Sequence, residues 1–147
     1  MIDQIKTWLS SLIASWYHWL ALAHRYWGHT RGLREEYEAA VQNFDRALLW
    51  NPQAAHIYLE RGILWWRELN HPRKAVQDFT IALKLDPDLI EAHFNRGIAY
   101  QQLQEYQEAV SDFETYLNEG THPHWRKYAR TMIRELNEWL IEPRGGN

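Results

Sequence analysis

The segment Lys74–Pro87 reads KAVQDFTIALKLDP, and a close copy of it lies on either side in the chain. Ala39–Pro52, 35 residues earlier, reads AAVQNFDRALLWNP, and Glu108–Thr121, 34 residues later, reads EAVSDFETYLNEGT. Repetition at a fixed period in this range is the sequence signature of a protein whose structural units stack on one another. Such an array presents an extended surface, so we expect this chain to bind a partner rather than to catalyse a reaction.

Within each copy, apolar residues recur at helical spacing. In the second copy they are Ala75, Val76, Phe79, Ala82 and Leu83. Residues three and four positions apart lie on the same face of a helix. We therefore predict one amphipathic helix for each copy, in which small residues allow a neighbouring helix to approach and a phenylalanine fills the remaining space.

A second kind of helix is predicted before each of the two later copies. Ile57–Leu69 and Ala92–Leu103 align with each other on Arg61-Gly62 and Arg96-Gly97. A glycine inside a helix costs about 1 kcal/mol relative to alanine. Two glycines at equivalent places therefore predict a neighbouring helix that comes too close for a side chain.

Prolines and glycines predict where the helices begin and end. Four prolines fit the first turn of a helix, where the missing N–H is harmless: Pro52, Pro72, Pro87 and Pro123. Asn51 and Asp86 would then be N-caps. Gly28 and Gly120 fit the C-terminal ends of helices, and Pro143 would end the last helix. The chain thus reads as helices joined by short turns, without a segment that alternates like a half-buried strand.

These features resemble the tetratricopeptide repeat, a helix–turn–helix unit of about 34 residues. The third unit carries the resemblance at Gly97, Tyr100, Ala109 and Phe113. The second unit carries it at Tyr58, Gly62, Trp65, Ala75, Phe79, Ala82 and Pro87. The resemblance covers roughly residues 33–120. It implies an all-α fold, a right-handed superhelix of antiparallel helix pairs with about seven helices in total.

The pattern divides the chain into five expected parts. Residues 1–32 form a long amphipathic helix and a loop, as a degenerate first helix of unit one, and residues 33–52 form its second helix. Residues 53–87 are unit two and residues 88–121 are unit three. Residues 122–147 hold an amphipathic helix and a short tail, which we expect to cap the open end of the array.

The N-terminal helix is predicted to carry a continuous apolar stripe. The stripe consists of Ile2, Ile5, Leu9, Leu12, Ile13, Trp16, Leu20, Ala23 and Trp27. Its C-terminal half is expected to cover the next helix, with Trp16, Leu20, Ala23 and Trp27 against Val41, Phe44 and Leu48.

The length of this helix predicts an overhang. A helix of about 26 residues is roughly 39 Å long, whereas a repeat helix of about 14 residues spans only ~21 Å. About the first dozen residues should therefore extend beyond the array. Their apolar side chains would lack a partner within the chain, which marks an interaction site. The predicted docking face consists of Ile2, Ile5, Trp8, Leu9, Leu12 and Ile13.

Three partners could cover this docking face: another copy of the chain, a different protein or a membrane surface. The opposite face is rich in serine and carries few basic residues, unlike the Lys-rich face of helices that bind membranes electrostatically. We therefore favour a protein partner. The alternative is a membrane-peripheral subunit of a larger complex that uses the helix as an in-plane anchor or docking helix.

The resemblance also implies a ligand-binding groove, lined by the first helix of each unit and holding a peptide or a helix. The residues placed in it are His56, Leu59, Glu60, Ile63, Trp66, Arg67, Glu91, Phe94, Asn95, Ile98, Gln101 and Gln102. Some members of the family hold a C-terminal carboxylate with a clamp of lysine, asparagine and arginine. Only Asn95 matches such a position here, and Glu60 and Glu91 would repel a carboxylate. As an alternative, Leu59, Ile63 and Phe94 only pack against adjoining helices.

Other functions are disfavoured by the composition. The net charge of −3 with mixed signs is not typical of nucleic-acid binding, and there are no cysteines to bind metal. The eight histidines do not have the spacing of a metal site, and the chain lacks a glycine-rich phosphate loop. We therefore expect no enzymatic activity, no metal and no cofactor. The expected location is the cytoplasm, either free or at a membrane surface.

Overall fold

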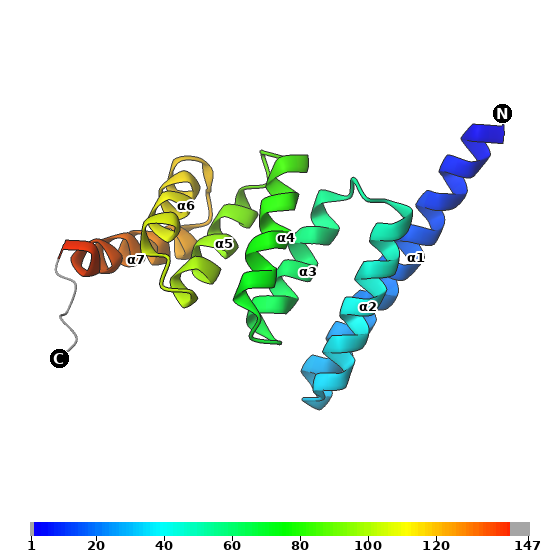
Figure 1. The fold of residues 1–147 in the computed structure, drawn as a ribbon, viewed down its shortest axis with the longest axis horizontal. Coiled ribbons are helices and arrows are strands. Elements are labelled where there is room, and N and C mark those ends of the chain that lie inside the picture. Colours follow the sequence, from blue (N-terminus) through cyan, green and yellow to red (C-terminus); the bar gives the residue numbers. More distant parts are fainter. Residues whose placement is uncertain (1, 142–147) are drawn as a thin grey trace.

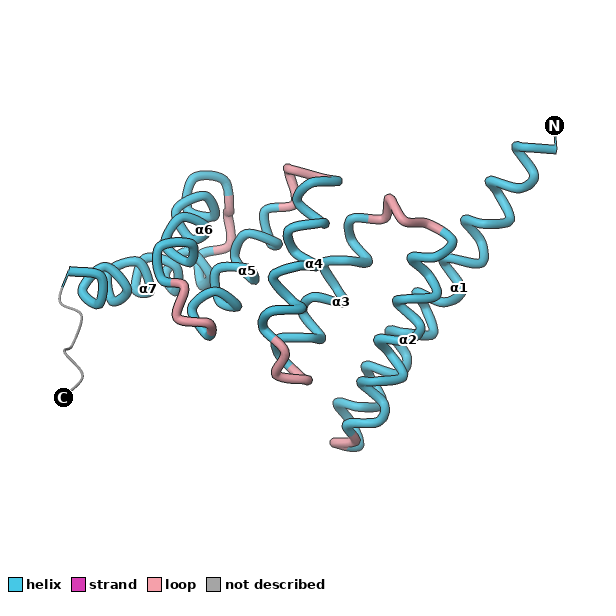
Figure 2. The backbone as a smooth tube through the Cα atoms, viewed as in Figure 1, coloured by secondary structure: helices cyan, strands magenta, loops and turns pink. Residues whose placement is uncertain are grey.

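The computed structural model describes residues 2–141, and within this range it consists of helices joined by loops, with no strand. The helices are α1 (Ile2–Arg31), α2 (Arg34–Trp50), α3 (Ala55–Arg67), α4 (Pro72–Leu85), α5 (Ile90–Gln102), α6 (Tyr106–Glu119) and α7 (Pro123–Ile141). The predicted all-α fold of seven helices is confirmed. The helices form an elongated array joined by short loops (Figures 1 and 2). The division into units at residues 52, 87 and 121 stays a prediction, and Pro143 lies outside the described residues.

Each helix pair after the first is closed by a phenylalanine that packs on a glycine. A Cβ atom added to Gly62 would lie 2.6 Å from Cε1 of Phe79, and one added to Gly97 would lie 3.0 Å from Cε1 of Phe113. Both distances are shorter than an ordinary contact between carbon atoms. The glycines are therefore present because an aromatic ring occupies the space of a side chain, as the sequence predicts.

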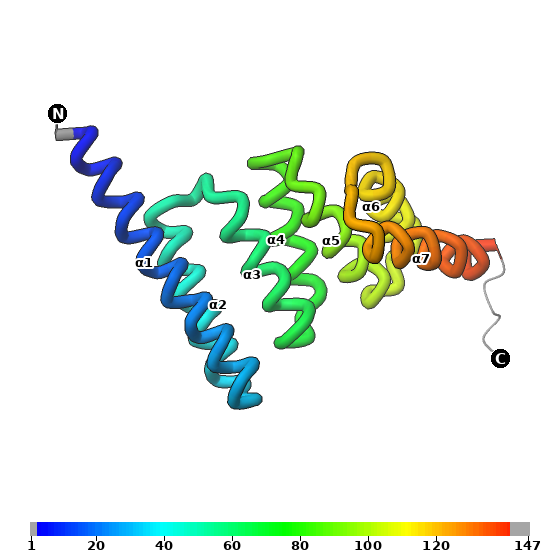
Figure 3. Tube along the Cα trace, turned by 180° about the vertical axis from the view of Figure 1, so that it is seen from behind, coloured from blue at the N-terminus to red at the C-terminus, as the bar shows by residue number. Residues whose placement is uncertain are grey.

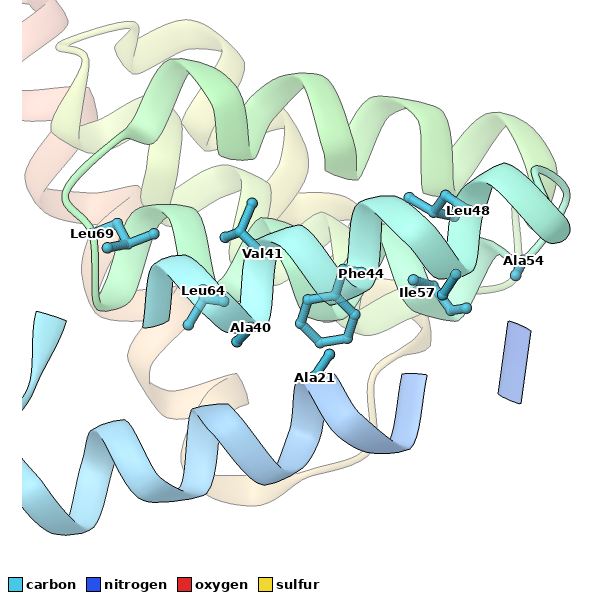
Figure 4. Close-up of a cluster of buried hydrophobic side chains, with 10 residues drawn as sticks. Ala21, Ala40, Val41, Phe44, Leu48, Ala54, Ile57, Leu64 and Leu69 are labelled. Atoms are coloured by element: carbon cyan, nitrogen blue, oxygen red, sulfur yellow. The ribbon is translucent and has the colours of Figure 1, made fainter. Parts of the chain in front are cut away.

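In the first pair, Ala21 takes the place of the glycine. Figure 4 shows Ala21 directly beneath the ring of Phe44, within one buried cluster. Gly28, predicted to end this helix, is instead buried inside α1, where an added Cβ would lie 2.7 Å from Cε1 of Tyr37. The helix ends at Gly32, whose φ of +66° is a left-handed conformation that glycine adopts readily. The first hairpin is thus longer than the others. For this reason the sequence pattern does not show which residues of α1 and α2 lie opposite each other.

The predicted ends of the other helices are partly right. Pro72 and Pro123 begin α4 and α7, and Gly120 is the C-cap of α6. Pro52 and Pro87 lie instead in the turns before α3 and α5.

Asn51 and Asp86 are not N-caps: they are the C-caps of α2 and α4. Each precedes a proline, and a proline forces the residue before it out of the helical conformation. For Asn51 the backbone angles are φ −138° and ψ 81°. The prediction fails because the Asn-Pro and Asp-Pro pairs stop one helix rather than start the next.

Two buried ion pairs join α3 to α4 and α5 to α6. Arg61 donates from Nε and Nη2 to the carboxylate of Asp78, at 2.8 and 2.6 Å. Arg96 donates in the same way to Asp112, at 2.7 and 2.8 Å. Arg61 also reaches back to Asp45 of α2 at 2.5 Å. Arg96 likewise donates to Thr80 of α4. Each arginine thus connects its own hairpin with the preceding one.

The first hairpin lacks this ion pair. Because Ala21 corresponds to Gly62, the residue before it, Leu20, stands where Arg61 stands in the next hairpin. Asn43 stands where Asp78 stands, and it is buried. Its Nδ2 donates to the carbonyl oxygen of Ala39 at 2.9 Å, and its Oδ1 has no hydrogen-bond partner within residues 2–141. The first unit has therefore replaced a charged pair by an apolar residue and an amide.

Helix α1 packs on α2 with a different face from the one predicted. The residues buried against α2 are small and seven positions apart: Ala14, Ala21 and Gly28. Trp16 and Trp27, expected to cover α2, are 61% and 38% exposed, and Leu20 and Ala23 are half-buried. The prediction is wrong because small side chains let two helices approach closely, so the small face is buried and the larger apolar stripe lies outside.

The N-terminal part of α1 projects beyond α2, as Figure 1 shows, and Figure 3 shows the same helix from the other side in front of α2. Within the predicted docking face, Ile5, Trp8, Leu9 and Leu12 are exposed and Ile13 is half-buried. The side chain of Ile2 lies outside the described part of the structure. Whether this face binds a partner stays a prediction.

Candidate functional site

A pocket of about 240 Å³ opens between α3 and α5, with contributions from α1, α6 and α7. We call it the groove pocket. It is lined by Arg25, Ile63, Trp66, Arg67, Glu91, Phe94, Asn95, Ile98, Tyr116 and Trp125. Seven of these residues were placed in the groove from the sequence: Ile63, Trp66, Arg67, Glu91, Phe94, Asn95 and Ile98.

The wall of the groove pocket towards α7 is aromatic. The ring of Phe94 lies 4.9 Å from that of Tyr116 and 5.0 Å from that of Trp125, measured between centroids. Phe94 is itself buried, so it both packs against neighbouring helices and forms part of the pocket wall. Burial raises the pKa of the Tyr116 hydroxyl, the negative charge of Glu91 raises it further, and Arg126 opposes the shift. The hydroxyl therefore stays protonated at neutral pH.

Trp66 provides an unpaired hydrogen-bond donor at this site. Its Nε1 is buried and has no hydrogen-bond partner among the described residues. A buried donor without a partner costs about 1–3 kcal/mol. Because the nitrogen itself is buried, a ligand in the pocket would contact the apolar part of the Trp66 ring rather than this N–H.

The remaining lining residues carry charge of both signs. Arg25 comes from α1, Arg67 from α3 and Glu91 from α5. Asn95 donates from Nδ2 to the backbone carbonyl of Glu91 at 2.7 Å, which fixes the orientation of its amide. The site thus combines an apolar, aromatic interior with two guanidinium groups and one carboxylate.

Five residues predicted for the groove lie outside this pocket. Glu60 pairs with His18 of α1, with 3.0 Å between Oε2 and Nε2. The ring of His56 lies 5.1 Å from that of His18. Desolvation lowers the pKa of His56, and the neighbouring His18 lowers it further, although Glu60 opposes both effects. These residues form a polar contact between α1 and α3.

The other three residues are on α3 and α5. Leu59 packs against the cluster of Ala75 and Phe79, as the alternative interpretation proposes. Gln101 donates from Nε2 to Sδ of Met132 at 3.4 Å, and Gln102 is exposed.

Three lining residues of the groove pocket were not predicted: Arg25, Tyr116 and Trp125. Arg25 was missed because the sequence analysis did not align α1 with the first helices of the later units. Tyr116 stands where the other copies have alanine. This departure from the repeat pattern was a signal that residue 116 has a role different from that of the alanines. Trp125 belongs to α7, which was interpreted only as a cap.

Two other kinds of site are not seen in the described part of the chain. No group of three or more histidine and carboxylate side chains within residues 2–141 is arranged to hold a metal ion. Nor does any helix in this range combine the length and apolar character required to cross a membrane.

Comparison with known proteins agrees with the fold and the repeat. The tetratricopeptide repeat family matches residues 70–134. This part of the chain consists of tetratricopeptide repeats. Its fold is similar to that of the Arabidopsis OM64 TPR domain, with a TM-score of 0.74, 24% sequence identity and coverage of 86% of this chain and 98% of that one. It is also similar to the first TPR of Spaghetti (RPAP3) bound to the HSP90 peptide SRMEEVD, with a TM-score of 0.68, 22% identity and coverage of 84% and 95%.

Curated tetratricopeptide relatives are longer proteins. DnaJ homolog subfamily C member 7 of Homo sapiens is 33% identical over 93 residues, which are 60% of this chain and 19% of that protein. The TPR repeat-containing thioredoxin TDX of Arabidopsis thaliana is 26% identical over 76 residues, or 52% of this chain and 20% of that protein. The chain spans about a fifth of the length of these relatives.

Proposed function

We propose that this chain is a protein-interaction module, without catalytic activity of its own, that holds an apolar segment of a partner in the groove pocket. The observation that carries the proposal is the groove pocket itself, in which apolar and aromatic side chains such as Ile63, Ile98 and Trp125 lie next to the charged groups of Arg25, Arg67 and Glu91. The similarity to tetratricopeptide domains, one of them bound to a peptide, supports a peptide ligand.

The lining residues suit a defined kind of ligand. An aliphatic or aromatic side chain would fit between Phe94, Ile98 and Trp125, which supply apolar surface from α5 and α7. A carbonyl oxygen next to it would accept a hydrogen bond from the guanidinium group of Arg25 or Arg67, which line the same pocket. An extended or helical segment recognised through one apolar anchor and a few polar contacts is a common mode of peptide binding.

We propose an internal segment of the partner rather than a free C-terminus. The domain of Spaghetti (RPAP3) is bound to SRMEEVD, an acidic peptide. In this chain only Asn95 stands at a position of the lysine, asparagine and arginine clamp with which some members of the family hold a carboxylate, and Glu91 lines the same pocket. Without the lysine and arginine of the clamp, a terminal carboxylate would form fewer charge-assisted hydrogen bonds.

Selection from a library of displayed peptides, with the segment fixed at both ends, tests this proposal. The dissociation constants of the selected peptides would be measured for the unmodified chain, for Ile98→Glu and for Leu49→Glu. Ile98 lines the pocket, and Leu49 is an exposed residue of α2 that serves as the matched control. We expect at least a tenfold weaker binding for Ile98→Glu, because a charge would be buried against the ligand, and no change for Leu49→Glu.

Two further measurements define the ligand. Arg67→Ala removes one of the two guanidinium groups of the pocket and should weaken binding by roughly 2- to 10-fold, the effect of one hydrogen bond. The peptide SRMEEVD should bind more weakly than the selected internal peptides. Equal binding of the selected peptides to the unmodified chain and to Ile98→Glu, or a clear preference for SRMEEVD, would contradict the proposal.

A further inference from the structure

The apolar face of α1 that points away from α2 has an unusual symmetry. Seven residues form its central line, which we call the outer stripe: Ile5, Leu9, Leu12, Trp16, Leu20, Ala23 and Trp27. Counted outward from Trp16, the spacings are four, three and four towards the N-terminus, and four, three and four towards the C-terminus. Rotation by half a turn about an axis through Trp16 therefore superimposes the stripe on itself.

The outer stripe corresponds to a surface that is buried in the later units. Ala21 of α1 corresponds to Gly62 of α3. Five residues before each of them lie Trp16 and Ile57, so Trp16 of α1 corresponds to Ile57 of α3. Ile57 is buried in the cluster that contains Leu48 of the preceding helix α2. In α1 there is no preceding helix within the described residues, so the same face remains open and has space for another helix.

The area of this face is that of a stable interface. Seven large side chains on the stripe and beside it are between 38% and 62% exposed: Ile5, Trp8, Leu9, Leu12, Trp16, Trp19 and Trp27. From the typical area of such side chains, they expose on the order of 800 Å². The largest apolar patch on a typical monomer is about 300–600 Å², and a standard interface takes about 800 Å² from each partner.

The other end of the array does not complement this face. The outward residues of α7 include Lys127, Arg130, Arg134 and Glu138, all exposed and spaced along one side of the helix. Stacking α7 of one copy on α1 of another would therefore bury charges against apolar residues. Residues 7–23 of α1, in contrast, contain no Asp, Glu, Lys or Arg. The outer stripe is complementary to itself and not to the opposite end of the chain.

We propose that the outer stripe pairs with the outer stripe of a second copy, with the two α1 helices antiparallel around a two-fold axis at Trp16. In this arrangement Leu12 faces Leu20 of the other copy, and Leu9 faces the smaller Ala23. Ile5, in the overhang, is covered by Trp27 of the second copy. The interface is isologous and closes as a dimer.

The mass of the full chain in solution tests the dimer. Light scattering at micromolar concentration should give twice the mass of one chain, and Trp16→Glu should give the mass of one chain. Trp16 is 61% exposed, so this variant should keep the helical circular dichroism of the parent. Leu49→Glu is the matched control, since Leu49 is 81% exposed on α2 and should not affect the dimer.

Cysteine variants test the antiparallel register, because the chain has no native cysteine. Trp16→Cys should form a disulfide between copies, since it lies at the axis. Leu9→Cys should cross-link efficiently only when mixed with Ala23→Cys. Two copies of residue 9 would be roughly 21 Å apart along the helix axis, too far for a disulfide.

Three results would overturn the proposal. The first is a single-chain mass at all concentrations for the folded, unmodified protein. The second is efficient cross-linking of Leu9→Cys with itself, which indicates parallel helices. The third is a monomer that co-sediments with phosphatidylcholine–phosphatidylserine vesicles and loses this binding in Trp16→Glu, which would assign the stripe to a lipid surface. Peptide binding in the groove pocket should be unaffected by Trp16→Glu, so the dimer and the proposed function can fail separately.

Discussion

Replacing Arg61 by leucine should strongly destabilise the fold, and a second substitution should restore much of the loss. Arg61 and Asp78 are joined by two hydrogen bonds, and the side chains are only 16% and 5% exposed. Arg61→Leu leaves the carboxylate of Asp78 buried without its counter-charge. Breaking a buried pair in this way costs about 3–5 kcal/mol of unfolding free energy.

The first hairpin of the same chain shows how the loss can be repaired. There, Leu20 and Asn43 occupy the positions of the arginine and the aspartate. The double variant Arg61→Leu/Asp78→Asn copies this pair into the second hairpin and removes the uncompensated charge. The remaining cost should be about 1–3 kcal/mol, because one amide oxygen is left without a partner, as at Asn43. The double variant should therefore be more stable than Arg61→Leu alone.

Urea denaturation followed by far-ultraviolet circular dichroism measures these differences, provided that the slope m is unchanged. The control is Arg34→Leu, because Arg34 pairs with Glu38 on the surface, where the two side chains are 60% and 54% exposed. That change should cost less than about 1 kcal/mol. The reasoning is refuted if Arg61→Leu costs no more than the control, or if the effects of the two substitutions in the double variant simply add.

Three further predictions concern individual residues. Gly62→Ala should lower the thermal midpoint more than Gly97→Ala, because the added Cβ is 2.6 Å from Phe79 in the first case and 3.0 Å from Phe113 in the second; equal midpoints would contradict the packing argument. Asn43→Leu should raise the unfolding free energy by about 1 kcal/mol in urea denaturation, since it removes a buried oxygen without a partner, and a loss of stability would count against this account. The pKa of His56 is lower in the folded protein than in the unfolded chain. As the pH falls, the unfolded chain therefore binds a proton first, and the native state loses stability below about pH 6.5. His56→Gln should therefore lose less stability than the parent between pH 7.5 and about pH 5.5 in urea titrations, and identical losses would show that His56 does not contribute.

The sequence predicts the hairpins because their packing leaves local marks. The spacing of Ala75, Phe79 and Ala82 indicates a helix, and Gly62 and Gly97 mark the places where a ring approaches the backbone. These signals depend on the residues of one hairpin alone. They are therefore readable without knowing how the hairpins are arranged.

The orientation of α1 could not be predicted in the same way. Periodicity shows that Trp16 and Trp27 share a face, but it does not show which face another helix covers. In the structure, contact with α2 depends on the size of Ala14 and Ala21, because close approach of two helices favours small residues. The groove pocket includes Arg25 for the same reason: its place follows from the register of α1, and that register is set by three-dimensional packing.

The unpaired indole N–H of Trp66 also makes the groove pocket directly observable by nuclear magnetic resonance. Each of the nine tryptophans gives one indole cross-peak in a proton–nitrogen correlation spectrum. The Trp66 signal should exchange slowly with solvent because its nitrogen is buried, and Trp66→Phe would assign it by removing a single peak. A ligand that enters the pocket changes the chemical shift of this proton, because the Trp66 ring lines the pocket, whereas association through the exposed Trp16 perturbs a different resonance. Occupancy of the pocket and self-association could thus be followed in one titration, without any label beyond nitrogen-15.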